Sequence, residues 1–208
     1  MPTIETSRWT RRAVLGAFAA MGALALVGGG GPARAAAADD AAAVVTQLSA
    51  ELTRLVNSGK SETALYSAFE ALLVKYGDMP AVAASVLGPP WRAASPAQKQ
   101  AFVAAFQAYL ARKYGKQFRD WQNASIAVTG AKDGGKAGVL VSSKVNRPGQ
   151  DAVAVDWQIS ARSGSPKVVN LIIEGVSMLA NERAEIAAML ETQKGSVDGL
   201  IGALKAAA

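Results

Sequence analysis

The chain of 208 residues contains no cysteine and no histidine. Their absence excludes disulfides, thiolate nucleophiles, imidazole acid–base catalysis and metal sites built on His or Cys ligands. A serine nucleophile would lack the histidine of a catalytic triad, and no G-x-S-x-G segment is present. An enzyme would therefore depend on carboxylates, hydroxyls, tyrosine, lysine or arginine, which leaves out the commonest catalytic groups.

The N-terminal region contains a long stretch without charged residues. Residues 1–12 are polar and basic, residues 13–27 carry no charge, and residues 28–38 are small and rich in glycine and alanine. This order is typical of the three regions of a signal peptide, and paired arginines directly before the apolar run are typical of a twin-arginine signal. A membrane-spanning helix would need ~20 apolar residues, more than this run has. The sequence predicts an export signal that is cleaved after Ala35 or Ala38.

A dense cluster of basic residues is also lacking. The whole chain has a net charge of +6, but the predicted signal over residues 1–38 holds four arginines and one glutamate, so its removal leaves +3. Without a basic stripe, nucleic-acid binding loses its main electrostatic support. The remaining residues 39–208 are enough for one domain with a sizeable core. We expect a single domain that binds no nucleic acid.

Apolar residues at spacings of three and four predict helices in both halves of residues 39–208. The clearest start is Ser95-Pro96-Ala97-Gln98, a capping box with proline at the first helical position. Gly88-Pro89-Pro90 predicts an extended turn. The predicted helices cover residues 39–57, 61–76, 78–87, 95–118, 177–193 and 196–206.

The apolar period changes to two after Trp121, which predicts strands. Four strands are expected, around residues 126–128, 139–145, 152–161 and 167–173. Such alternation indicates an antiparallel sheet with one covered face. The predicted fold class is α+β, in which a curved four-stranded antiparallel sheet is covered on one face by a layer of helices.

Two patterns leave more than one interpretation open. Asp156 lies on the polar side of its strand and Glu174 at a strand end, so a carboxylate-dependent hydrolase needs one of them in a cleft beside a second titratable group. Solvated or capping side chains are the simpler interpretation. The large apolar side chains on both the helices and the strands fit an ordinary core or a ligand pocket, and the pattern by itself favours the core.

Three segments resemble the MlaC/toluene-tolerance family. Residues 86–98, VLGPPWRAASPAQ, with the aromatic residues that follow at Phe102, Phe106 and Tyr114, are similar to that family's "LG-x-x-W-[RK]-x-A-[ST]-x-x-Q-x-x-x-F-x-x-x-F" signature. Residues 168–178, VVNLIIEGVSM, and Arg183 resemble its "V-x-D-[VL]-x-I-E-G-V-S" segment. The final helix, with Gly199, Leu200 and Ile201, fits as well.

The resemblance implies a soluble periplasmic carrier of phospholipids that is neither an enzyme nor dependent on a cofactor or metal ion. Members have a nuclear-transport-factor-like curved sheet with extra helices, and the acyl chains lie in an apolar cavity between the two layers. They act as monomers that shuttle lipid between an outer-membrane lipoprotein complex and an inner-membrane complex of MCE protein and ABC transporter. The resemblance also leaves a hopanoid-associated branch, HpnM, as an alternative.

Family membership would place the lipid contacts on the inner faces of the helices and strands. The expected lipid-binding residues are Val86, Leu87, Trp91, Phe102, Phe106, Val155, Trp157, Ile173, Val176, Met178 and Leu179. Asn170 stands where the family usually has aspartate, and Pro166 precedes Lys167 where tryptophan is common. The alternative from another class is an envelope scaffold without cargo, in which Phe102, Phe106 and Trp157 interlock and leave no void.

Overall fold

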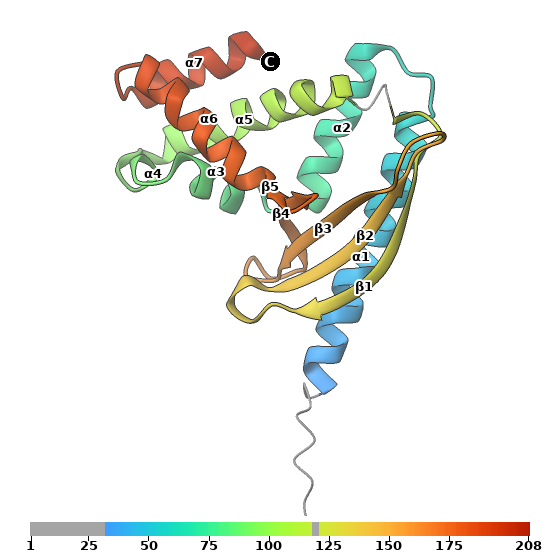
Figure 1. Ribbon diagram of the computed structural model, residues 1–208. Coiled ribbons are helices and arrows are strands. Elements are labelled where there is room, and N and C mark those ends of the chain that lie inside the picture. The colour runs from blue at the N-terminus through green and yellow to red at the C-terminus, as the bar shows by residue number, and fades with distance from the viewer. Residues whose placement is uncertain (1–31, 118–120) are drawn as a thin grey trace, which may run out of the picture. The chain divides into compact units, whose positions relative to one another are not determined.

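The helices and strands follow the predicted order of helices, antiparallel strands and helices (Figure 1). The computed structural model describes residues 32–117 and 121–208. The elements are α1 Pro32–Val56, α2 Glu62–Tyr76, α3 Met79–Leu87, α4 Pro90–Ala93, α5 Pro96–Gln117, β1 Ser125–Asp133, η2 Gly135–Ala137, β2 Val139–Asn146, β3 Val153–Ser160, β4 Lys167–Ile173, β5 Val176–Ser177, α6 Met178–Thr192 and α7 Val197–Ala207.

The predicted export signal lies mostly outside the described residues, because these begin at residue 32. Its last residues, 32–38, belong to α1, which begins at Pro32 and not at the predicted start near Asp39. Alanine is the best helix former, so the alanine-rich segment continues the helix toward the N-terminus. The signal peptide and its cleavage site stay predictions.

The sheet is an antiparallel meander in the order β1-β2-β3-β4-β5. Its first four strands confirm the prediction, and the two-residue β5 is an addition to it. Val141 pairs with Trp157, and Val145 pairs with Val153, so the alternate apolar residues of β2 and β3 share one face. Helix α1 packs on β1 and β2. The fold class is α+β, as predicted.

The covered face of the sheet contains one polar arrangement. Trp157 Nε1 donates a hydrogen bond to Ser143 Oγ at 2.8 Å, and this hydroxyl donates to the Val155 carbonyl at 3.0 Å. Both side chains are buried. Because a buried indole N–H needs a partner, Ser143 lets the large tryptophan ring lie in an otherwise apolar face.

The apolar residues between the sheet and α1 and α2 form one hydrophobic core, and a second core lies among α3, α5, α6 and α7 (Figure 1). The rings of Phe102 and Phe106 on α5 stack with their centroids 5.8 Å apart. Ile186, Leu200 and Leu204 complete this core from α6 and α7. Figure 1 shows these helices together, apart from the helix α1 that covers β1 and β2. The helical core is therefore a distinct layer with its own packing.

The start of α5 confirms the predicted capping box. The Ser95 backbone N–H donates to Gln98 Oε1 at 3.0 Å, and the Gln98 N–H donates to Ser95 Oγ at 3.2 Å. The predicted extended turn at residues 88–90 is wrong, because Pro90 begins the four-residue helix α4. Proline at the first helical position has no N–H to leave unpaired, so the second proline starts a helix instead of preventing one.

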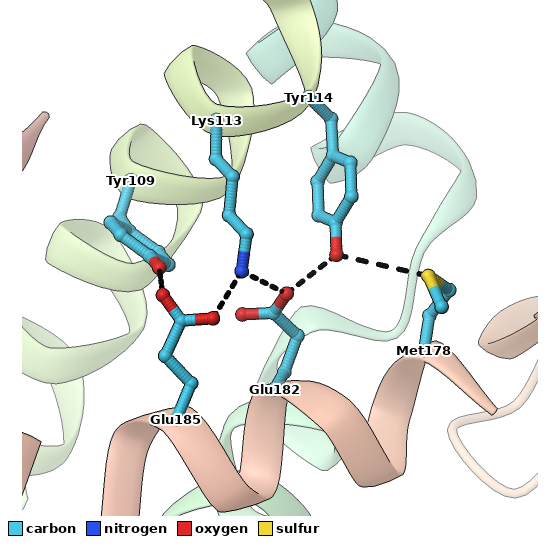
Figure 2. A network of polar contacts seen from close by, with 6 residues as sticks. All are labelled: Tyr109, Lys113, Tyr114, Met178, Glu182 and Glu185. Carbon is cyan, nitrogen blue, oxygen red and sulfur yellow. Dashed lines mark hydrogen bonds and ion pairs between the residues drawn. The ribbon is translucent and has the colours of Figure 1, made fainter. Parts of the chain in front are cut away.

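A network of charged and hydroxyl groups joins α5 to α6 (Figure 2). Lys113 Nζ lies 2.7 Å from Glu182 Oε1 and also pairs with Glu185. The Tyr114 hydroxyl donates to Glu182 Oε1 at 2.5 Å, and the Tyr109 hydroxyl donates to Glu185. Glu182 is 4% exposed. Because a buried carboxylate is costly unless it is paired, Lys113 and Tyr114 are the partners that allow α6 to pack here.

Replacement of Phe102 should show how much the helical core contributes to stability. We expect Phe102→Ala to lower the free energy of unfolding by about 3–5 kcal/mol, because it removes a fully buried ring and leaves a cavity. Urea denaturation followed by circular dichroism measures the change. As a control, Val74→Ala removes a side chain that is 55% exposed and should cost less than about 0.5 kcal/mol.

The Lys113 network can be tested separately. Lys113→Met should lower the free energy of unfolding by about 1–3 kcal/mol, because Glu182 then stays buried without its cation. The double variant Lys113→Met/Glu182→Leu should recover most of this loss in the same urea measurement. If the double variant were no more stable than Lys113→Met, an uncompensated carboxylate could not be the cause.

Candidate functional site

An apolar cavity of about 230 Å³ lies between the sheet and the helices. Strand residues on its wall include Val145 of β2, Val155 and Trp157 of β3, and Leu171 and Ile173 of β4. The apolar residues of β2 and β3 reach the wall because side chains in a strand point alternately to its two faces. One face of three neighbouring strands therefore forms a continuous hydrophobic wall.

The opposite walls come from five helices. Helices α1 and α2 contribute Leu48, Leu52, Phe69, Leu72, Leu73 and Tyr76; α3 contributes Met79 and Val82; α5 contributes Phe106, Leu110, Tyr114 and Gln117; and α6 contributes Met178, Leu179 and Glu182. On α5 the wall residues are spaced by three or four, which places them on one face of the helix. The cavity thus lies where the sheet core and the helical core face each other.

Six of the eleven expected lipid-binding residues lie on the cavity wall: Phe106, Val155, Trp157, Ile173, Met178 and Leu179. Val86, Leu87 and Phe102 are buried within the helical core instead. Trp91 is partly buried against that core, with Lys99 Nζ 5.7 Å from its ring centroid, and Val176 is 50% exposed on β5. Lipid contact by any of these residues stays a prediction.

Sequence reasoning missed the wall residues of α1 and α2. Leu48, Leu52, Phe69 and Leu72 follow the same helical spacing as the residues that were chosen. The spacing identifies an apolar face but does not say whether that face meets another helix or an empty space. The same limit explains Phe102, which lies on the apolar face of α5 one turn before Phe106 but is covered by other helices.

The two carboxylates considered for hydrolysis have structural contacts. Asp156 accepts a hydrogen bond from Ser142 Oγ at 2.6 Å, and Glu174 accepts one from the backbone N–H of Ala154. Neither lies on the cavity wall. Neither carboxylate therefore has the position in the cavity that the hydrolase interpretation would require.

Asn170, which departs from the family pattern, lies where β4, β5 and α6 meet. Its Oδ1 accepts a hydrogen bond from the Leu179 N–H at 3.0 Å, and its Nδ2 donates to Ser177 Oγ at 3.1 Å. Asn170 and Leu179 both line the cavity. An amide can donate and accept at once, so this residue holds the start of α6 against the sheet without adding charge to the wall.

Glu182 and Tyr114 give the cavity a polar margin on the side of α5 and α6 (Figure 2). Burial, helped by the hydrogen bond to Glu182, raises the pKa of Tyr114 above its ordinary value. Burial and the bond to Glu185 raise the pKa of Tyr109 to about 12. Both hydroxyls therefore stay protonated at neutral pH and act as donors.

Burial and hydrogen bonding have opposing effects on the pKa values of Lys113 and Glu185, which lie beside this polar margin. Burial works against the charge of Lys113, but its hydrogen bonds with Glu182 and Glu185 outweigh that effect and raise its pKa. Burial likewise favours the neutral form of Glu185, but the hydrogen bonds from Lys113 and Tyr109 lower its pKa. Lys113 is thus a cation and Glu185 an anion at neutral pH, and the ion pair between them persists.

Residues 32–117 and 121–208 contain no group of three or more acidic side chains able to hold a metal ion. They also contain no helix that is both long and apolar enough to cross a membrane.

Comparison with solved structures relates this fold to a lipid-binding protein. The structure of a phospholipid-binding protein from Ralstonia solanacearum in complex with a phospholipid has a TM-score of 0.70 to this chain and is 22% identical to it. The similarity covers 81% of this chain and 96% of that one. At this level of identity the likeness shows a shared fold.

The family comparison tests the resemblance seen in the sequence motifs. The family model described as MlaC protein matches residues 44–206. This range holds all three resembling segments and covers more than half of the chain, so the family prediction is confirmed, while the hopanoid-associated branch stays a prediction. The chain belongs to the MlaC family.

Proposed function

We propose that this protein is a phospholipid carrier that holds acyl chains in the cavity between sheet and helices. The observation that carries the proposal is the apolar cavity itself, which lies beside Phe106 and Trp157, where a scaffold without cargo would have interlocked side chains. Membership of the MlaC family and the fold shared with a phospholipid-binding protein support it. Carriage needs a dry cavity and no catalytic group.

The hydrophobic effect explains why such a lipid needs a carrier. Moving about 30 methylene groups of two acyl chains into water costs about 25 kcal/mol, at about 0.8 kcal/mol for each. The cavity of about 230 Å³ is smaller than the roughly 300–1,000 Å³ that is usual for ligand pockets. We therefore expect its walls to move apart when lipid is bound.

The proposal also includes the compartment in which the protein acts. The N-terminal order of basic, apolar and small residues supports export by a twin-arginine signal to the periplasm. There the protein would shuttle phospholipid, as a monomer, between an outer-membrane lipoprotein complex and an inner-membrane complex of MCE protein and ABC transporter. The family membership supports this route.

Lipid that remains with the purified protein gives the first test. The mature protein from its native host should carry about one diacyl phospholipid per chain, measured by organic extraction and mass spectrometry. Stripped protein should take up phospholipid from vesicles. Recovery of no lipid together with no uptake would contradict carriage, and recovery of hopanoids alone would reassign the cargo.

A wall substitution tests whether the cavity holds the acyl chains. Leu171→Trp should reduce the bound phospholipid at least about tenfold, because the larger side chain fills the space that an acyl chain would occupy. Ile172→Trp is the matched control, since the neighbouring residue of β4 is not on the wall. Equal loading of both variants, with melting temperatures like that of the wild type, would contradict the assignment.

A further inference from the structure

Arg147 lies next to the cavity at the end of β2. It follows Val145 by two residues, and Val145 is on the cavity wall. Its guanidinium carbon lies 5.7 Å from the ring centroid of Trp121, which is also on the wall. This geometry is that of a cation–π contact. A positive charge is thus held against the apolar lining.

The guanidinium lacks an anionic partner in the described part of the chain. Its Nε atom is buried and makes no hydrogen bond, and no carboxylate among these residues forms an ion pair with it. Arginine is seldom buried unless it is paired. The side chain as a whole is half-buried, so an anion can reach it from the solvent side.

The chemistry of the free donors indicates which anion fits. A guanidinium presents its N–H groups as a planar fork that matches the oxygens of a phosphate and forms two parallel hydrogen bonds with it. The contact with Trp121 uses no N–H donor of Arg147 as a hydrogen bond, and its Nε has no hydrogen-bond partner. Because Trp121 and Val145 are on the wall, Arg147 lies within reach of the polar end of a lipid whose acyl chain occupies this part of the cavity.

We propose that Arg147 binds the phosphate group of the lipid, with Trp121 holding the guanidinium in place. This assignment rests on the proposed carriage of phospholipid and adds a headgroup contact to it. The cargo would then be selected for a phosphate ester, and a neutral diacylglycerol would bind less tightly than a phospholipid with the same chains. The ring of Trp121 acts through Arg147 and need not touch the lipid.

The experiment compares two lipids that differ in the phosphate-bearing headgroup. Dipalmitoyl phosphatidylglycerol and dipalmitoylglycerol are titrated into lipid-free mature protein, and tryptophan fluorescence reports binding because Trp121 and Trp157 are on the wall. The wild type should prefer the phospholipid about tenfold, as expected for a hydrogen bond to a charged group. Arg147→Gln should remove this preference without changing the affinity for dipalmitoylglycerol.

Two variants distinguish the bidentate geometry of the guanidinium from the effect of its positive charge alone. Arg147→Lys keeps the charge but loses the bidentate geometry, so its preference should be intermediate. Arg112→Gln removes the same charge from an exposed residue of α5 that is not on the cavity wall, and it should keep the wild-type preference. If Arg147→Gln kept the wild-type preference, or if Arg112→Gln lost it equally, Arg147 would not be the phosphate ligand.

Inorganic phosphate distinguishes a lipid site from a free-anion site. Titrated alone, it should give no binding with a Kd below about 1 mM, because the acyl chains supply most of the affinity of the lipid. Tighter binding that Arg147→Gln abolishes would overturn the lipid assignment in favour of free phosphate. If both lipids bind equally well, this inference fails alone; if neither binds, the proposed carriage fails with it.

Discussion

The inward face of the sheet has to be kept from water by helices that also have a core of their own to complete. Helices α3, α5, α6 and α7 bury Phe102, Ile186 and Leu200 among themselves, while α1 packs on β1 and β2 and α2 packs on α1 and α5. The two cores meet along α5, whose Phe106 and Tyr114 line the cavity. A side chain already packed within its own layer cannot also fill the space between layers, and the cavity lies in that space.

The same arrangement explains how far sequence reasoning could reach. The alternation in β2 and β3 and the capping box at Ser95 are local, so they predicted strands, faces and a helix start that the structure confirms. To predict that Phe106 lies on the cavity wall and Phe102 in the helical core, one must know which helices cover each turn of α5. Those contacts join residues that are far apart in the sequence. The family motifs identified the fold because they span the whole domain, but they do not separate core residues from wall residues.

Polar groups at the edges of the cavity have different roles. Glu182 is paired with Lys113 and Tyr114, and Asn170 is paired with Ser177 and Leu179, so each joins two elements. Arg147 has an aromatic ring beside it but no ion-pair partner among the described residues, whereas the Glu182 carboxylate has the Lys113 cation. The pairing state of a group, and not its mere presence beside a cavity, distinguishes a structural contact from one that a ligand would complete.

The bridge between Gly77 and β4 has a consequence for how the cavity can widen. Gly77 pairs with Val168, and the Asp78 N–H donates to the Val168 carbonyl at 2.9 Å, so the corner between α2 and α3 is bonded to the sheet. In the sheet register Val168 pairs with Ile159, and Ile159 with Val139, whereas Val145 lies at the opposite end of the strands. The corner between α2 and α3 is thus fixed to one end of the strands, while β5 joins the start of α6 to Ile172 and Ile173 toward the other end. Widening of the cavity therefore has to come from the wall segments between these two attachments.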